Sequence, residues 1–188
     1  MTDFYTIGHS NRSAEEFLGM LAQAGIRLVA DVRAIPRSRY NPQFNADALA
    51  QFLSESGIAY EHLPELGGRR GPPKIEDGSP NMGWENESFR NYAGYAATAA
   101  FREGLQKLRM RGSAARTAVM CAEAVWWRCH RRIITDYLIA SGENVLHIMD
   151  RGKVQRAVLN EAAAIGADGV ISYPPAQLDL LAPARDEA

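Results

Sequence analysis

Hydrophobic positions along the chain follow two alternating periods. Short, mostly apolar runs predict buried strands, and runs whose apolar residues recur every three or four positions predict helices. The expected strands cover residues 4–8, 28–32, 58–63, 117–121 and 145–149. The expected helices cover residues 13–24, 45–56, 88–111 and 129–141, with a break of the third near Thr98. Strands that alternate with helices predict parallel crossovers, and therefore a single compact α/β domain over residues 1–188. Its central, mostly parallel sheet would have about five strands flanked by helices.

Local signals support two of the helix starts. Ser13 and Glu16 have the spacing of a capping box, in which each side chain binds the other residue's backbone N–H. Asn45 is the expected N-cap of the second helix, with Phe44 and Leu49 spaced as a hydrophobic staple.

Two regions depart from this regular alternation. Residues 67–87 are rich in Gly, Pro and Asn and are too long for an ordinary connection, which predicts a functional lid or a partly disordered loop. Beyond Asp150 the pattern weakens. There, residues 155–164 are expected to form a short helix and residues 169–173 a marginal edge strand.

Composition narrows the class of protein. The chain has 188 residues, a net charge of −1 and 46% hydrophobic residues, as expected of an ordinary globular protein without a wholesale polyanion-binding surface. No apolar run approaches about 18 residues and the N-terminus lacks a signal-peptide pattern, so we expect a cytoplasmic protein with no membrane segment. In that compartment the two cysteines are expected to be thiols.

Arginine is the dominant basic residue, and many arginines cluster. The clusters are Arg33/Arg37/Arg39, Arg69/Arg70 and Arg128/Arg131/Arg132. Two interpretations remain open: a solvated surface with a compositional bias, or anion binding by guanidinium groups that match phosphate or carboxylate.

Polar residues follow four of the predicted strands, and the carboxyl ends of parallel strands lie on one edge of a sheet. The residues expected to converge there are His9, Ser10, Asn11, Asp31, Arg33, Glu65, Gly67, Gly68, Cys121 and Glu123. The loop and helix start after Cys121 add Trp127, Cys129, His130 and Arg131.

Roles follow from the chemistry of these side chains. Cys121 is the candidate nucleophile or redox thiol, because Glu123, nearby arginines and a helix N-terminus can lower a thiol pKa; a small core-filling residue is the alternative. His130 or His9 is the candidate general base, and Glu123 the acid/base or orienting group. Arg33, Arg131 and backbone N–H groups are expected to hold an anion.

The remaining members of the set are expected to contact substrate: Ser10, Asn11, Asp31, Glu65, Gly67, Gly68 and Trp127. For Cys129, burial on the inner face of the following helix is the favoured role.

Three mechanisms compete at this site. A cysteine-phosphatase loop needs arginine six positions after the cysteine, but Trp127 stands there, so that pattern fails. A zinc site could draw on Cys121, Cys129, His130 and His9, but the cysteine spacing is unlike a Cys-x-x-Cys knuckle, so neither a metal ligand nor a cofactor is predicted. A thiol or acid/base hydrolase meets no contradiction.

The leading hypothesis is a small enzyme that acts on an anionic, nucleotide-like substrate at this Cys/His/Glu/Arg site. A nucleic-acid-binding or processing module is one alternative, motivated by the arginine clusters and the paired tryptophans. A metal-binding hydrolase is the other. A homodimer is the default expectation for the oligomeric state.

Several segments together resemble the domain-of-unknown-function 488 family. They are TIGHSNRS (6–13), DVRAIPRSRYNPQF (31–44), HLPELGG (62–68), SFRNYA (88–93), CAEAVWWRCHRR (121–132) and VLHIM (145–149). The resemblance spans nearly the whole chain and implies a compact α/β fold. It also implies a site built from His9, Asp31, Arg33, Glu65, Cys121, Glu123, Cys129, His130 and Arg131. It supplies no reaction, because the family is functionally uncharacterised.

Overall fold

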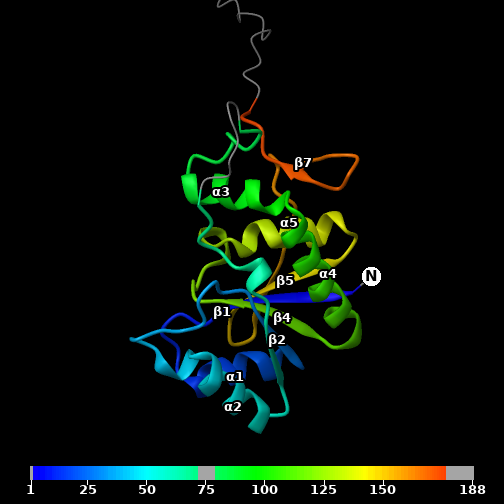
Figure 1. The fold of residues 1–188 in the computed structure, drawn as a ribbon. Coiled ribbons are helices and arrows are strands. Elements are labelled where there is room, and N and C mark those ends of the chain that lie inside the picture. The colour runs from blue at the N-terminus through cyan, green and yellow to red at the C-terminus, as the bar shows by residue number, and fades with distance from the viewer. Residues whose placement is uncertain (1, 72–78, 177–188) are drawn as a thin grey trace, which may run out of the picture.

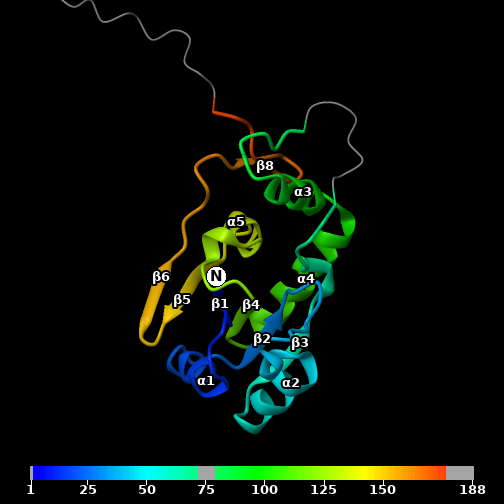
Figure 2. The same ribbon diagram turned by 90° about the vertical axis from the view of Figure 1, so that its left-hand side faces the viewer.

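Six strands form one sheet in the order β3-β2-β4-β1-β5-β6 in the computed structural model, which describes residues 2–71 and 79–176 (Figures 1 and 2). The strands are β1 (Asp3–Gly8), β2 (Leu28–Asp31), β3 (Ala59–His62), β4 (Thr117–Cys121), β5 (Asn144–Asp150) and β6 (Lys153–Arg156). All neighbouring pairs are parallel except β5 with β6, which is antiparallel. The predicted α/β class with a mostly parallel sheet is confirmed, with one strand more than expected.

Helices cover both faces of this sheet (Figures 1 and 2). α1 (Ala14–Gln23) and α2 (Ala46–Glu55) lie on one face, and α3 (Glu87–Ala96), α4 (Ala99–Ala114) and α5 (Arg131–Ala140) lie on the other. Successive strand residues point to opposite faces, so each strand contributes side chains to a hydrophobic core on each face of the sheet. In β1, Phe4 packs in the core beneath α4 and α5, whereas Tyr5 packs in the core beneath α1.

The strand order reverses direction between β1 and β4. From β1 the chain moves by way of α1 and α2 to β2 and β3 at one side of the sheet, and from β4 it crosses by way of α5 to β5 on the other side. Such a point leaves a crevice outside the carboxyl ends of the two strands, where open α/β sheets bind ligands. The topology therefore places the segments after Gly8 and Cys121 at this crevice.

Helix starts agree with the sequence fully in one case, in part in a second and not in a third. Of the capping box expected at Ser13 only one half forms, because the Glu16 carboxylate pairs with Arg12 instead. The Ser13 hydroxyl accepts the backbone N–H of Glu16 at 3.0 Å, and Thr98 caps α4 at the predicted break. Asn45 occupies the N-cap position of α2 but makes no capping bond. Its side-chain oxygen instead accepts the backbone N–H of Ser38 at 2.7 Å, so it fixes the loop after β2 rather than the helix.

The C-terminal part of the described chain differs from the prediction. Residues 155–164 do not form a helix: β6 pairs with β5 as a hairpin, and Gly152 adopts the positive φ of +69° in its turn. The segment 169–173 does not extend the central sheet either. Its strand β8 (Ile171–Ser172) pairs only with β7 (Ala164–Ile165), in a separate two-stranded sheet.

The expected loop at residues 67–87 is described in part, because residues 72–78 lie outside the described residues. Short 3-10 turns complete the secondary structure: η1 (Pro42–Phe44), η2 (Pro64–Leu66) and η3 (Trp126–Arg128). None of the helices within residues 2–71 and 79–176 has the length and hydrophobicity that a membrane span requires.

Candidate functional site

A cavity of about 770 Å³ opens at the carboxyl edge of the sheet. It is lined by residues from the segments 9–11, 33–41, 68–69, 86–92 and 121–130, which follow β1, β2, β3 and β4 or lead into α3 and α5. A volume of this size lies within the range typical of small-molecule sites. Segments that were expected to converge at the carboxyl edge of the sheet therefore line one cavity.

A close backbone contact joins the two strands at the base of the cavity. The N–H groups of His9 and Ser10 donate to the carbonyls of Cys121 and Ala122 at 3.0 and 2.9 Å, extending the β1–β4 ladder beyond the strands. A Cβ atom on Gly8 would lie 1.9 Å from the carbonyl oxygen of Glu123, so only glycine permits this approach.

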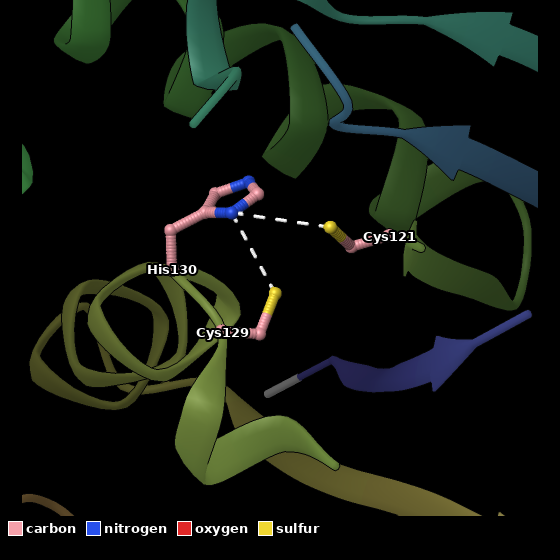
Figure 3. A group of neighbouring side chains, drawn as sticks. All are labelled: Cys121, Cys129 and His130. Atoms are coloured by element: carbon pink, nitrogen blue, oxygen red, sulfur yellow. Dashed lines mark hydrogen bonds between the residues drawn. The ribbon is translucent and has the colours of Figure 1, made fainter. Parts of the chain in front are cut away.

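Cys121, Cys129 and His130 form a compact group that we call the thiol–imidazole cluster (Figure 3). Nδ1 of His130 lies 3.9 Å from Sγ of Cys121 and 3.6 Å from Sγ of Cys129. All three of these atoms lie within 4.8 Å of one another. Cys121 ends β4, whereas Cys129 and His130 follow η3 and precede the first turn of α5 rather than belonging to it as predicted.

The protonation of the His130 ring is set by its surroundings. Its Nε2 lies 2.9 Å from the carbonyl oxygen of Val32, and because a carbonyl only accepts, Nε2 carries the hydrogen. In the neutral ring the lone pair of Nδ1 then faces the two sulfurs. A Cβ atom on Gly68 would lie 2.8 Å from Nδ1, and the Tyr92 ring packs edge-on at 4.9 Å, so the imidazole is held from three directions.

The two thiols differ in acidity. Burial opposes ionisation of Cys129, but the hydrogen bond from Cys121 and the charge of Arg131 outweigh it and lower the pKa of Cys129 well below its usual range. Nε of Arg131 donates to Sγ of Cys129 at 3.4 Å. The hydrogen bond to Cys129 and then burial raise the pKa of Cys121. The predicted lowering of the Cys121 pKa is therefore wrong, and the more acidic thiol is Cys129.

A second buried network lies beside this cluster. The guanidinium of Arg33 donates to both carboxylate oxygens of Asp31, at distances from 2.6 to 3.1 Å, and Tyr60 donates to the same carboxylate at 2.9 Å. Nη1 of Arg33 lies 3.2 Å from Nε2 of His9, while Nδ1 of His9 lies 2.8 Å from the Ser10 carbonyl. Burial lowers the pKa of His9 to about 4. His9 is thus neutral: its Nδ1–H donates to the Ser10 carbonyl and its Nε2 accepts from Arg33.

The structure divides the predicted site residues into two groups. Those that line the cavity are His9, Ser10, Asn11, Arg33, Gly68, Cys121, Glu123 and His130. Those that do not are Asp31, Glu65, Gly67, Trp127 and Arg131.

Each residue outside the cavity wall has another visible contact. Glu65 forms an ion pair with Lys107 of α4, and Gly67 packs against Ala34. The Trp127 ring is 44% exposed and lies edge-on to Trp126. Arg131 is buried behind the cluster, where its guanidinium also donates to the carbonyl of Glu123.

Sequence analysis left several cavity residues out of its site. The additional polar ones are Arg37, Ser38, Asn41, Arg69, Asn86, Ser88 and Arg128. The clustering of arginines was the signal that could have located Arg37, Arg69 and Arg128. Cys129, which the family resemblance already included in the site, also lines the cavity.

Charge around the cavity is unbalanced. Among the described residues that line it are four arginines, Arg33, Arg37, Arg69 and Arg128, and one carboxylate, Glu123. Arg33 is already paired with Asp31, but the other three guanidinium groups form no ion pair with a described residue. The cavity mouth is therefore electropositive, which favours an anionic ligand.

Backbone strain also concentrates at the cavity. Ser10 and Arg69, with φ values of +50° and +59°, are the non-glycine residues with positive φ in the described chain, and both line the cavity wall. Strained residues of this kind cluster at ligand sites, where the surrounding structure holds them in place.

Fold and site together define an open α/β protein with a thiol–imidazole cluster at its topological switch point. A family model, Domain of unknown function DUF488, matches residues 13–138. The chain belongs to this family, as its motifs indicated. No curated protein and no solved structure matches it.

Proposed function

We propose that the chain is an enzyme acting on an anionic, nucleotide-like substrate bound in the cavity. The observation that carries the proposal is the combination of three arginines at the mouth, which form no ion pair with a described residue, with two thiols and an imidazole at the wall. Guanidinium groups suit phosphate and carboxylate, and a reactive cluster is superfluous in a site that only binds.

Two parts of the cavity wall would bind different parts of the substrate. Arg37, Arg69 and Arg128 would bind the charged group of the substrate, with the hydroxyls of Ser10 and Ser88 as further hydrogen-bond partners. The aromatic rings of Phe89 and Tyr92 also line the cavity and provide apolar surface for the uncharged part.

The thiol–imidazole cluster would be the reactive centre, with Glu123 as the acid/base group. Within the cluster Cys129 is the thiol expected to ionise first, because Arg131 and Cys121 both donate to its sulfur. His9 has both ring nitrogens engaged and would position Arg33 instead of exchanging protons with substrate.

Calorimetric titration with pyrophosphate and AMP at low salt tests the binding step. Arg37→Gln and Arg128→Gln should each weaken binding about 10-fold or more, since a hydrogen bond to a charged group contributes about 1.5–3 kcal/mol. Arg27→Gln is the matched control, because Arg27 is exposed and precedes β2 at the opposite edge of the sheet. Equal losses in all three variants, or no binding in the wild type, would contradict the proposal.

A panel of nucleoside phosphates and sugar phosphates then tests turnover. Conversion is followed by phosphorus NMR and mass spectrometry, with His130→Gln as the variant expected to lose it. A bound compound that is recovered unchanged across the panel, with and without added zinc, would leave a binding protein and refute the enzyme.

A nucleic-acid ligand is the second candidate, favoured by the exposed ring of Trp127 beside exposed Arg128. A ring of this kind can stack on an unpaired base, and such binding falls steeply with salt. Fluorescence anisotropy with a short single-stranded oligonucleotide should then show a loss of affinity in Trp127→Ala. A response that is flat with salt removes this candidate.

A further inference from the structure

The thiol–imidazole cluster has the composition and spacing of a transition-metal site. We propose that Cys121, Cys129 and His130 bind one zinc ion, with the fourth coordination position open to the cavity. Its binding stands on the geometry of the cluster alone, whereas its use in catalysis rests on the proposed function.

Distances within the cluster are the first support. Zinc binds thiolate at about 2.3 Å and imidazole nitrogen at about 2.0–2.1 Å, so a tetrahedral site separates sulfur from nitrogen by about 3.6 Å. The two observed Sγ–Nδ1 distances are 3.6 and 3.9 Å. These donor atoms are therefore already near the positions that a metal ion requires, although Cys121 and Cys129 stand in different elements.

Orientation of the imidazole is the second support. The hydrogen bond from Nε2 of His130 to the Val32 carbonyl leaves Nδ1 without a hydrogen and directs its lone pair toward the sulfurs (Figure 3). Histidines that bind metals usually donate their other ring N–H to such an acceptor, which fixes the tautomer and the ring plane. Gly68 leaves room for the ring at this position, where any side chain would collide with it.

The charge of the surroundings is the third support. Two thiolates and a neutral imidazole would balance the charge of a divalent ion, and Arg131 donates a further hydrogen bond to Sγ of Cys129. Thiolate ligands of this softness select zinc over magnesium or calcium. Both cysteines are unbridged thiols, as metal binding requires.

An open fourth position would give the metal a chemical use. Zinc sites with three protein ligands keep a water molecule in the fourth position and lower its pKa to about 7. Glu123 lines the same cavity and is the carboxylate available there to accept the proton from that water. The products of this step are a metal-bound hydroxide and a protonated Glu123, at an arginine-rich mouth that would hold the anionic substrate.

Cobalt(II) provides the direct test, because it occupies zinc sites and reports its ligands by absorption. Titration of the reduced wild-type protein should saturate at one equivalent, with intense visible bands of tetrahedral cobalt and a near-ultraviolet thiolate-to-cobalt charge-transfer band. Zinc should then abolish both signals. A weak octahedral spectrum without the thiolate band overturns the proposal without any need for a variant.

Variants assign the ligands. Cys121→Ser, Cys129→Ser and His130→Gln should each weaken zinc binding at least about 100-fold, while Gly68→Ala, which displaces the imidazole, should weaken it about 10–100-fold. His62→Gln is the matched control, because His62 lies on β3 outside the cluster and its Nε2 binds only the Arg33 carbonyl. Zinc affinity in a ligand variant equal to that of His62→Gln overturns the assignment.

Thiol protection gives an independent readout, since the chain has only two cysteines. Zinc should slow alkylation of both by iodoacetamide in parallel. If reduced protein binds no zinc and diamide oxidation instead links Cys121 to Cys129, the cluster is a redox pair and the metal proposal is overturned.

The outcomes also separate the metal from the proposed function. Pyrophosphate binding that requires Arg37 and Arg128, in a protein without the cobalt signature, would refute the metal proposal and support the anion site. A normal cobalt signature in a protein that binds neither pyrophosphate nor AMP would refute the proposed function and support the metal proposal.

Discussion

The buried ion pair between Asp31 and Arg33 allows a quantitative test of the network beneath the cavity. The two side chains are 0% and 5% exposed, and Tyr60 donates a further hydrogen bond to the carboxylate. Replacing Asp31 by asparagine preserves the shape but leaves the Arg33 charge in a dry environment without a counterion. Removing one partner of a buried pair costs about 3–5 kcal/mol, a large share of the about 5–15 kcal/mol typical of a whole domain.

Urea unfolding followed by circular dichroism measures this loss. Glu61→Gln is the matched acid-to-amide control, because Glu61 lies on the neighbouring strand β3 and pairs with Arg111, with side chains 28% and 58% exposed. An exposed pair contributes no more than about 1 kcal/mol, so the control should change the free energy of unfolding only slightly.

A double variant separates loss of the pair from loss of Asp31 itself. Asp31→Asn with Arg33→Gln removes the uncompensated charge and should be about 1–3 kcal/mol more stable than the sum of the two single changes predicts. A cost below about 1 kcal/mol for Asp31→Asn, or simple additivity in the double variant, would show that solvent or His9 already compensates Arg33.

Other predictions concern pH and close packing. Burial raises the pKa of Asp136 from 3.8 to about 6, so the free energy of unfolding should fall by about 3 kcal/mol as pH rises from 3.8 through 6. Urea unfolding of Asp136→Asn at several pH values should show no such fall. Burial lowers the pKa of His147 from 6.5 to about 4, so the free energy of unfolding should fall as pH drops through that interval. This dependence has the sign opposite to that of Asp136, and His147→Gln should remove it. If either variant keeps the wild-type dependence of the free energy of unfolding on pH, another group titrates in that pH interval. Gly8→Ala would place a Cβ 1.9 Å from the Glu123 carbonyl and should cost about 3 kcal/mol. Gly71→Ala, whose added Cβ would meet no atom of the described residues within 4 Å, should change the melting temperature little. Equal melting temperatures would contradict the close approach.

Sequence periodicity predicted the central sheet well because each parallel strand is a short apolar run between amphipathic helices. The convergence of His9 and Cys121 at one edge was expected because parallel strands end on the same edge of a sheet, whereas the direct pairing of β1 with β4 was not predicted. The same reasoning was wrong over residues 155–164, which begin within the exposed strand β6 and contain no helix. An exposed strand carries no hydrophobic pattern, so its hairpin pairing with β5 decides its conformation.

The candidate site was predicted in outline and not in its contacts. Sequence placed a thiol, an imidazole and arginines at one edge of the sheet, which the cavity confirms. The sequence could not show that the turn η3 places Cys129 beside Cys121, because two residues eight positions apart in an irregular segment have no spacing that a helix or strand would fix. Nor could it show that Glu65 turns away to Lys107, since that pairing depends on the position of α4.

Positive charge around the cavity is arranged in two layers with different consequences. Arg131 lies buried behind the cluster, where its guanidinium donates a hydrogen bond to the sulfur of Cys129, and Arg33 is neutralised by Asp31. Arg37, Arg69 and Arg128 lie at the exposed mouth, where a diffusing anion meets them first. Because salt screens exposed charges far more than buried ones, the proposed anion binding should weaken with ionic strength while metal binding by the cluster should hardly change. A salt response of anion binding without one of metal binding would thus separate recognition from chemistry within one cavity, and parallel responses would show that both depend on the same charges.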